Sequence, residues 1–349
     1  MTRGRLERLL GIDHPIVLGP FGGLSCVELT AAVSERGGLG SYGLYGYDPD
    51  RIRGTVAALR AATSRPFALN LWLPTGDEVD PQDVALDGYA RALEPFFAEV
   101  GLPLPEAPRA FLPDVDDQLE AVLEAAPAAL SLVYGVPSSE LVGAAHARGI
   151  VVIGAATTVE EAVALDRAGV DVVVASGFEA AGHRVSFLRP PEDSLVGTFA
   201  LVPQVADAVD VPVVAAGGIA DRRGVAAALA LGADGVQVGT AFLRTRQSAA
   251  TQAHRRAIDA AAARGTVLTR AMSGRLARGV PNRAVQTIEA AGAIAPFPAQ
   301  NWLTGRFRTE AARRDVGELL SLWAGQGAPL ARLTEASDVF DELVAGLGR

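Results

Sequence analysis

The sequence predicts an α/β fold, a (β/α)8 TIM barrel with a smaller, mainly helical second domain. Short β-branched runs recur along the chain, and an alanine-rich helical stretch follows each of them. The runs are almost continuously apolar, which is typical of parallel strands buried on both faces. Strands that alternate with helices over about 240 residues favour a closed barrel over an open sheet. The eight expected strands are Pro15–Leu18, Leu39–Ser41, Phe67–Leu71, Ala129–Val133, Val151–Gly154, Val172–Ala175, Val213–Ala216 and Gly235–Val238.

Helix start signals lie between these strands. The segments Ser25–Glu28 and Thr158–Glu161 have the spacing of a capping box. Asp48 offers an N-cap, and Pro49 follows it in the first helical turn. The first strand runs into Gly19–Leu24, which lacks the Gly-x-Gly-x-x-Gly pattern of a dinucleotide-binding first turn. The barrel is therefore favoured over a doubly wound sheet.

Two regions interrupt the alternation. Residues Pro74–Pro113 separate the third and fourth strands by far more than the usual short connection, and they hold seven prolines and a helical stretch at Val84–Val100. We expect a loop insertion there, which could cover one mouth of the barrel. After the eighth strand the pattern becomes helical. The expected parts are a barrel at 1–245 with the insertion at about 74–113, a smaller helical substrate-side domain at 246–325, and a C-terminal helical segment at 326–349 that packs back on the barrel.

The composition indicates a folded protein whose partners are not polyanions. The chain has 349 residues, of which 49% are hydrophobic and 20% charged, whereas disordered chains have fewer apolar residues. Its net charge of −9 argues against nucleic acid or an anionic membrane as a partner. No apolar run reaches the roughly 18 residues of a membrane helix, and the first residues lack the apolar core of a signal peptide. We therefore expect a cytoplasmic protein.

Two glycine turns on adjacent strands predict a phosphate site. The seventh strand ends in Ala215–Ile219 and the eighth in Gln237–Thr240, and each turn leads into a helix. Functional groups of such barrels lie at the carboxyl ends of the strands, where unpaired backbone N–H groups suit a phosphate. A single glycine turn of this kind is more simply explained as a tight connection without a ligand. Two such turns on adjacent strands favour phosphate binding. The chain contains no lysine, which excludes a Schiff-base aldolase and a P-loop, so the phosphate is expected to belong to a cofactor.

His183 is the strongest candidate for a catalytic side chain. It follows the sixth strand, small residues flank it, and an imidazole exchanges protons near neutral pH. The alternative is a loop histidine that faces water. His14 lies at the opposite end of the barrel and is expected to be structural, while His146 and His254 lie in helices and are expected to be solvated.

Asn70 is a polar amide at the end of the apolar third strand, where it can donate and accept hydrogen bonds. We favour a contact to the edge of a heterocycle, and a satisfied buried amide is the alternative. The single cysteine, Cys26, can form neither an internal disulfide nor a cysteine-based zinc site. The sequence shows no recognisable glycosidase carboxylate pair, nucleophile elbow or metal cluster.

Several segments together resemble the nitronate monooxygenase family, formerly called 2-nitropropane dioxygenases. The resemblance runs along nearly the whole chain, and its most specific part is the Glu-Ala-x-Gly-His pattern after the sixth strand. The segments that carry it are Pro15–Gly23, Gly37–Gly40, the strand with Asn70, Gly177–Arg184, Ala215–Asp221, Gly235–Phe242, Ser273–Arg278 and Trp323–Gly327.

The resemblance implies an FMN enzyme that oxidises alkyl nitronates, and possibly nitroalkanes, with O2 to carbonyl compounds and nitrite. Flavin carries the redox step, and the protein supplies position and electrostatics. His183 would face the substrate as the catalytic residue. The implied partners are a small nitro compound and O2, with the chain as a monomer or homodimer. The implied FMN-binding residues are Pro20, Phe21, Gly22, Asn70, Ser176, Gly182, Gly217, Gly218, Gln237, Gly239 and Thr240.

The chain departs from the family pattern at three positions around the implied site. Ser176 stands where relatives often have glutamine, and Ala181 stands where they have glycine. Many relatives place a histidine near the end of the fourth strand, where this chain has Val133 within Ser131–Gly135. These changes imply a shorter flavin partner, a methyl group beside the pocket and a less polar pocket.

Two other functions remain open from the sequence. An NAD(P)H-dependent flavin reductase, either an enoyl-acyl-carrier-protein reductase or a quinone reductase, resembles the chain in the glycine turns. An acidic carrier protein would need a basic patch, which Arg270, Arg275 and Arg278 could form, although a solvated face is the preferred interpretation. A flavin-binding protein without turnover is the third possibility, because fold does not fix function.

Overall fold

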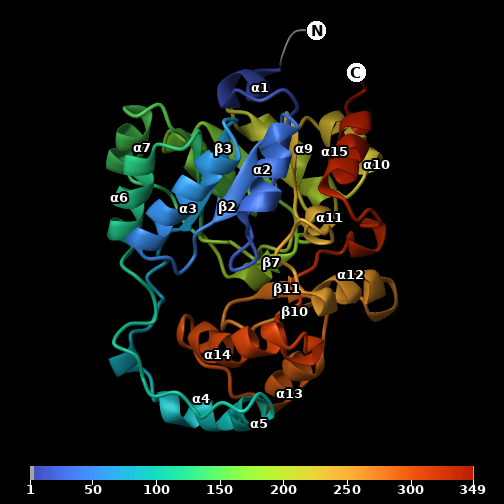
Figure 1. Cartoon of the computed structure of the whole chain (residues 1–349). Helices are drawn as coiled ribbons and strands as arrows, with labels where there is room; N and C mark the ends of the chain where they lie inside the picture. Colours follow the sequence, from blue (N-terminus) through green and yellow to red (C-terminus); the bar gives the residue numbers. More distant parts are fainter. Residues whose placement is uncertain (1–3, 349) are drawn as a thin grey trace.

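Eight parallel strands form the barrel at the centre of the molecule (Figure 1). The computed structural model describes residues 4–348. The hydrogen-bonded order is β1-β9-β8-β6-β5-β4-β3-β2, and a parallel bridge between Val17 and Leu39 closes the barrel. The strands are β1 Ile16–Leu18, β2 Gly40–Gly43, β3 Phe67–Trp72, β4 Ala129–Val133, β5 Val151–Ala156, β6 Val172–Ser176, β8 Val213–Ala216 and β9 Gly235–Val238.

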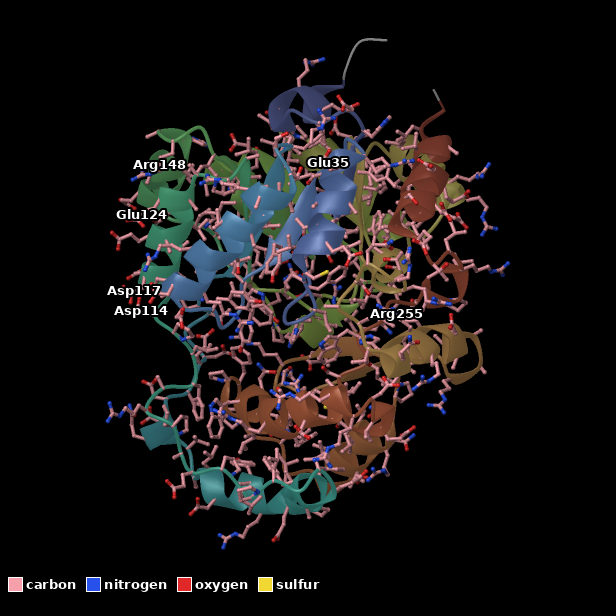
Figure 2. All side chains as sticks on the ribbon, in the orientation of Figure 1. Glu35, Asp114, Asp117, Glu124, Arg148 and Arg255 are labelled. Carbon is pink, nitrogen blue, oxygen red and sulfur yellow. The ribbon has the colours of Figure 1, made fainter. Side chains whose placement is uncertain are left out.

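Every apolar run predicted as a strand is a strand, which confirms the TIM barrel. The ends differ by one or two residues, since β5 continues to Ala156 and β6 to Ser176. Helices surround the sheet, and on α6 the side chains of Asp117 and Glu124 point away from the barrel (Figure 2). The surrounding helices are α1 Arg5–Leu10, α2 Val27–Glu35, α3 Pro49–Ala62, α6 Val115–Ala125, α7 Ser139–His146, α8 Val159–Arg167, α9 Thr198–Ala208, α10 Arg222–Ala230 and α11 Thr240–Leu243.

Two of the three predicted helix caps are present. Asp48 caps α3 by accepting a hydrogen bond from Arg51 N at 2.8 Å, and Thr158 caps α8 through Glu161 N at 3.2 Å. The predicted cap at Ser25 is wrong, since Cys26 is the N-cap of α2. Ser25 instead stabilises the turn after β1, where its hydroxyl oxygen accepts hydrogen bonds from backbone amides.

The insertion between β3 and β4 packs against the C-terminal helices. The predicted helix Val84–Val100 is two helices, α4 Leu86–Ala92 and α5 Glu94–Glu99, after a short 3₁₀ turn η1 at Pro81–Asp83. The break lies at Leu93, because Pro95 lacks the N–H that a continuous helix needs. Phe96 lies 5.4 Å from Phe307 between ring centroids, so α5 packs on the helix that carries Phe307 (Figure 1).

A helical unit lies at the carboxyl end of the barrel strands (Figure 1). It comprises α12 Gln252–Arg264, β10 Val267–Thr269, β11 Ala277–Gly279, α13 Arg283–Ala291, α14 Ala299–Arg313 and the 3₁₀ turn η3 Gly317–Leu319. The short strand β7, Gly182–His183, leaves the barrel after β6 and pairs antiparallel with β11. This three-stranded sheet joins the barrel to the helical unit at the predicted catalytic histidine.

The C-terminal segment returns to the barrel. Helix α15, Ala336–Val344, packs against α2 and α10, and Glu342 forms an ion pair with Arg222 at 2.5 Å. The remaining 3₁₀ turns are η2 Pro191–Asp193, η4 Ala328–Leu330 and η5 Ala345–Leu347. Within residues 4–348, no helix combines the length and the apolar character that crossing a membrane requires.

Candidate active site

One cavity of about 340 Å³ opens at the carboxyl ends of the barrel strands. The loops after β1, β3, β6, β8 and β9 form its walls, as expected for a barrel of this class. Every residue predicted for the site lines it, although these residues are far apart in the sequence. They are Pro20, Phe21, Gly22, Asn70, Ser176, Gly182, His183, Gly217, Gly218, Gln237, Gly239 and Thr240.

The turn after β1 is held by Ser25. Its Oγ accepts hydrogen bonds from Phe21 N at 3.1 Å and Gly43 N at 2.9 Å, and it donates to Phe21 O at 2.9 Å. A Cβ on Gly43 would lie 3.0 Å from Phe21 O, so the glycine lets β2 approach this turn closely. Phe21 and its neighbours therefore form a fixed wall of the cavity.

The two predicted glycine turns form an anion cradle. Gly217 and Gly218 have φ angles of +111° and +74°, which favour glycine. A Cβ on Gly217 would lie 2.9 Å from Thr198 Oγ1. In the described chain, the backbone N–H groups of Gly217, Gly218, Gly239 and Thr240 donate to no backbone carbonyl of another turn or loop. Free amides at neighbouring turns fit the oxygens of a phosphate group.

Residues 323–327 cover this cradle from the helical unit. Gly325 N donates to Thr240 Oγ1 at 3.0 Å, and Gln326 N donates to Glu179 O at 2.9 Å. A Cβ on Gly325 would lie 2.7 Å from Glu179 O, so only glycine permits this close approach. The segment therefore ties together the loops after β6 and β9.

Glu179 has a structural function in the loop after β6. Its carboxylate accepts hydrogen bonds from Thr198 N at 2.9 Å and Thr198 Oγ1 at 2.8 Å, which caps the start of α9. Thr198 Oγ1 also lies 3.1 Å from Gly217 O. Through Thr198, the carboxylate of Glu179 connects the loop that carries His183 with the glycine turn after β8. Glu179 also lines the cavity.

Ser273 determines which nitrogen of His183 carries the proton. His183 Nε2 lies 2.8 Å from Ser273 Oγ, and Ser273 Oγ donates to Arg275 O at 3.1 Å. A hydroxyl has a single proton, and we assign it to Arg275 O, which makes Ser273 the acceptor from His183 and places the hydrogen on Nε2. Nδ1 then holds the lone pair, and no group in residues 4–348 forms a hydrogen bond with it.

His183 is neutral in this environment. Burial, together with the positive charges of Arg275 and Arg308, lowers its pKa to about 3. Its ring centroid lies 4.9 Å from that of Trp72 and 5.5 Å from that of Trp323. Two aromatic rings thus confine an uncharged imidazole whose Nδ1 can accept a proton.

A buried cation on α14 also reaches the cavity. Arg308 donates to Asn301 Oδ1 at 2.7 Å and to Ser321 Oγ at 2.9 Å, and Asn301 Nδ2 donates to Tyr45 OH at 3.1 Å. Its Nε is buried without a hydrogen-bond partner. Burial lowers its pKa to about 10, so it is still charged at neutral pH. Its hydrogen-bond partners are neutral, which leaves the charge available for an anion.

The amide side chains predicted to meet a heterocycle have free acceptor groups. Asn70 Nδ2 donates to Ser131 O at 3.1 Å, which orients the amide and leaves Oδ1 without a partner among the described residues. Gln237 is half-buried and makes no side-chain hydrogen bond there. Val133, Ser176 and Ala181 also line the cavity, so all three departures from the family pattern lie at its wall.

The arginines considered for a basic patch do not form one. Arg275 is 7% exposed and pairs with Asp77 and Glu78, and Arg278 is 3% exposed and donates to Phe178 O. The preferred interpretation, a solvated arginine face, is therefore wrong for these two. Their long side chains instead fill the junction between the barrel and the helical unit.

Arg184, next to His183 in the sequence, points away from the cavity. It is 2% exposed, and its guanidinium donates to Gly177 O at 2.8 Å and Ser176 O at 3.0 Å. Burial lowers its pKa to about 10. The side chain braces the end of β6, so its function in the site is indirect.

The other histidines lie outside the cavity. His14 packs edge-on against Phe340 at the opposite end of the barrel, as the structural interpretation predicts. His146 is exposed and lies 2.9 Å from Asp171. The prediction that His254 is solvated is wrong, because it is 2% exposed and bonds to Trp323 O at 2.9 Å. Burial lowers its pKa to about 4.

The most important residues missed by sequence reasoning come from the helical unit. Asn301 and Arg308 are seven residues apart, which is two turns of α14 and hence one face. Polar side chains on a largely buried helix are the signal that could have indicated a site. Nothing in the neighbouring sequence indicates that this face of α14 contacts the barrel. The other missed residues around the site are Tyr45, Trp72, Ser273 and Trp323. Within residues 4–348, no cluster of three or more His, Cys, Asp or Glu side chains could hold a metal ion.

Comparisons with known proteins identify the family of this chain. The nitronate monooxygenase family model matches residues 3–346. A nitronate monooxygenase of Pseudomonas aeruginosa is 42% identical over 350 residues, which cover 98% of this chain and 99% of the relative. A probable nitronate monooxygenase of Staphylococcus aureus is 36% identical over 98% of this chain and 97% of its own length.

Solved structures agree with the sequence relatives. The nitroalkane oxidase of Streptomyces ansochromogenes has a TM-score of 0.89 and 37% identity, covering 98% of this chain and 97% of its own. FabK from Thermotoga maritima has a TM-score of 0.78 and 30% identity, covering 100% and 97%. The chain therefore belongs to the nitronate monooxygenase family and is a flavin-dependent oxidoreductase with a TIM-barrel fold.

Proposed function

We propose that this enzyme binds FMN and uses O2 to oxidise alkyl nitronates, and more slowly nitroalkanes, to carbonyl compounds and nitrite. The observation that carries the proposal is the combination of a neutral histidine and a buried, uncompensated arginine in one cavity with a glycine anion cradle. The nitro compound and O2 are its small-molecule partners. We also propose that the chain acts as a monomer or homodimer.

The cavity residues fit FMN. The amides of Gly217, Gly218, Gly239 and Thr240 would hold the phosphate, because these residues line the cavity and their N–H groups donate to no carbonyl of another turn or loop. Pro20, Phe21 and Gly22 would lie against the ring system, and Gly182 leaves room beside it. The amides of Asn70 and Gln237 and the hydroxyl of Ser176 would contact its polar atoms. The flavin supplies the electron-transfer chemistry of the reaction.

Arg308 would bind the oxygens of the nitronate. A guanidinium without a carboxylate partner attracts an anion, and Arg308 lines the cavity in which the nitronate would lie. Asn301 and Ser321 hold the guanidinium in place through neutral contacts that leave its charge uncompensated. The positive charge therefore favours the nitronate over its neutral nitroalkane.

His183 Nδ1 would act as the base when a neutral nitroalkane binds. The lone pair on Nδ1 can accept the α-proton, and the nitronate that forms would be stabilised by Arg308. A pKa of about 3 makes the resting imidazole a weak base, but an adjacent nitronate raises this pKa by favouring the charged form. A nitronate arrives already deprotonated, so it does not need this step.

The helical unit is proposed as the substrate-side domain, at 246–325 beside a barrel of 1–245, with 326–349 as the returning segment. Arg308, Asn301 and Ser273 all come from it, whereas the FMN-binding residues come from the barrel. The cavity between the two parts thus separates cofactor binding from substrate recognition.

The likeness to FabK supports a second candidate, an NAD(P)H-dependent flavin reductase. The burial of Arg275 and Arg278 weakens the version with an acidic carrier protein, because these two side chains are not available for docking. Reduction by a nicotinamide without any nitronate reaction would favour the second candidate.

The His183→Asn variant tests the proposed function through its two substrates. Turnover of nitroethane should fall by roughly 100-fold or more, because the base is lost. Oxidation of preformed ethyl nitronate should stay within about tenfold, because that substrate carries no α-proton to remove. Oxygen uptake and nitrite release measure both activities, with flavin content as the control. Equal loss of both activities would contradict the assignment of His183 as a base.

A further inference from the structure

A second cavity of about 180 Å³ lies directly behind one wall of the active site. Tyr45 and Trp72 line both cavities, so their rings form the partition between them. The ring centroids of these two residues lie 4.3 Å apart, and that of Trp72 lies 4.9 Å from the imidazole of His183. The tryptophan therefore contacts the proposed base, and the same residue borders the second cavity.

The second cavity is suited to a hydrocarbon chain. Its wall includes the apolar side chains of Leu73, Leu112, Pro113 and Val115. Its charged groups, Arg275 and Glu78, form an ion pair with each other at 2.6 Å, so neither needs a charged ligand. An apolar wall with satisfied polar groups recognises alkyl carbon and offers nothing to an additional anion.

We propose that Trp72 sets the upper limit on substrate chain length by closing the active site off from this second cavity, which would otherwise receive a straight alkyl tail. The inference rests on the proposed function, since it concerns the tail of the same nitronate. A substrate whose nitronate carbon lies near His183 and whose tail points toward β3 meets the Trp72 ring first. Removing that ring opens a ready-made apolar space.

The test compares preformed nitronates of nitroethane and 1-nitrohexane in the wild type and in Trp72→Ala. The ratio of kcat/KM for the hexyl over the ethyl substrate should rise at least about tenfold, since each newly buried methylene contributes about fourfold. The ratio is the readout because Trp72 touches His183, and its loss slows both substrates together. If Trp72→Ala retains no flavin, Trp72→Leu provides the same comparison with a smaller change.

Two further variants locate the effect. Val115→Trp, added to Trp72→Ala, should abolish the gain, because it fills the second cavity from α6. Trp302→Ala is the matched control, since this tryptophan packs on Phe111 and lines neither cavity, and it should leave the ratio unchanged.

The outcomes separate the inference from the function on which it rests. A hexyl-to-ethyl ratio that is unchanged in Trp72→Ala, while both nitronates are oxidised, overturns the chain-length limit alone. A gain that survives Val115→Trp also overturns it, because the tail would then lie elsewhere. Wild-type protein that contains flavin and oxidises neither nitronate contradicts the proposed function itself.

Discussion

The hydrogen bond between His183 and Ser273 links a single hydroxyl to the chemistry of the site. Because Ser273 donates to Arg275 O, it accepts the Nε2 hydrogen and leaves the lone pair on Nδ1. Burial beside two arginines keeps the ring neutral, with a pKa of about 3. A histidine at its ordinary pKa of about 6.5 would instead be half-protonated near neutral pH.

The pH dependence of nitroethane turnover tests this arrangement. In the wild type, kcat/KM should show no ionisation near 6.5 between pH ~5 and ~7.5, because the free enzyme loses the basic form of His183 only near its lowered pKa.

Ser273→Ala should reduce nitroethane turnover by roughly tenfold and leave nitronate oxidation unchanged, since only nitroethane needs the fixed tautomer. An acidic limb near pH ~6.5 in the wild type, or equal loss on both substrates in the variant, would contradict the assignment.

At the scale of elements, the proposed cofactor site depends most directly on the turn after β8. Gly218 has a φ of +74°, and a Cβ there would lie 3.7 Å from Glu179 Cβ, so a side chain fits in space at a moderate conformational cost. Asparagine tolerates this conformation better than most residues and has nearly the shape of aspartate. The two substitutions therefore differ mainly in charge.

Gly218→Asp should weaken FMN binding by at least about tenfold relative to Gly218→Asn, because a carboxylate repels the phosphate that the cradle holds. Equilibrium dialysis of apoprotein with FMN measures both dissociation constants. Gly143→Ala, in the middle of α7 with no atom within 4 Å of the new Cβ, is the control for a general glycine effect. Equal affinities for Gly218→Asp and Gly218→Asn would place the phosphate elsewhere.

The elements were largely predictable because their signals are local. The barrel strands follow from apolar runs, and the caps at Asp48 and Thr158 follow from short spacings. Ser25 was predictable as a polar side chain beside a helix but not as the anchor of the turn after β1, because its partner Gly43 lies on another strand. The break of the predicted helix at Leu93 could have been read from Pro95.

At the scale of the whole molecule, the site exists only where the barrel meets the helical unit. The barrel residues that line the cavity could be predicted because glycine turns at strand ends have a recognisable pattern. Arg308 and Ser273 could not, since they act through contacts with residues far away in the sequence, and His254 is buried by the same docking of α12. The burial of Arg275 and Arg278 is a further consequence of this junction.

The junction also bears on the choice between the two candidate functions. A cavity with an uncompensated cation and a neutral base suits an anionic or acidic carbon substrate. A nicotinamide reductase would need room for a second nucleotide, whereas residues 323–327 cover the phosphate cradle and tie it to the loop after β6. These features support the proposed reaction with a small nitro compound.

Anaerobic absorbance titration of the FMN-loaded enzyme tests the central claim most directly. Propionate 3-nitronate should change the visible spectrum of the bound flavin within the time of turnover, because the nitronate is the electron donor. NADPH at the same concentration should leave the spectrum unchanged. Rapid bleaching by NADPH, together with no change on adding the nitronate, would contradict the account and identify the enzyme as a nicotinamide-dependent reductase.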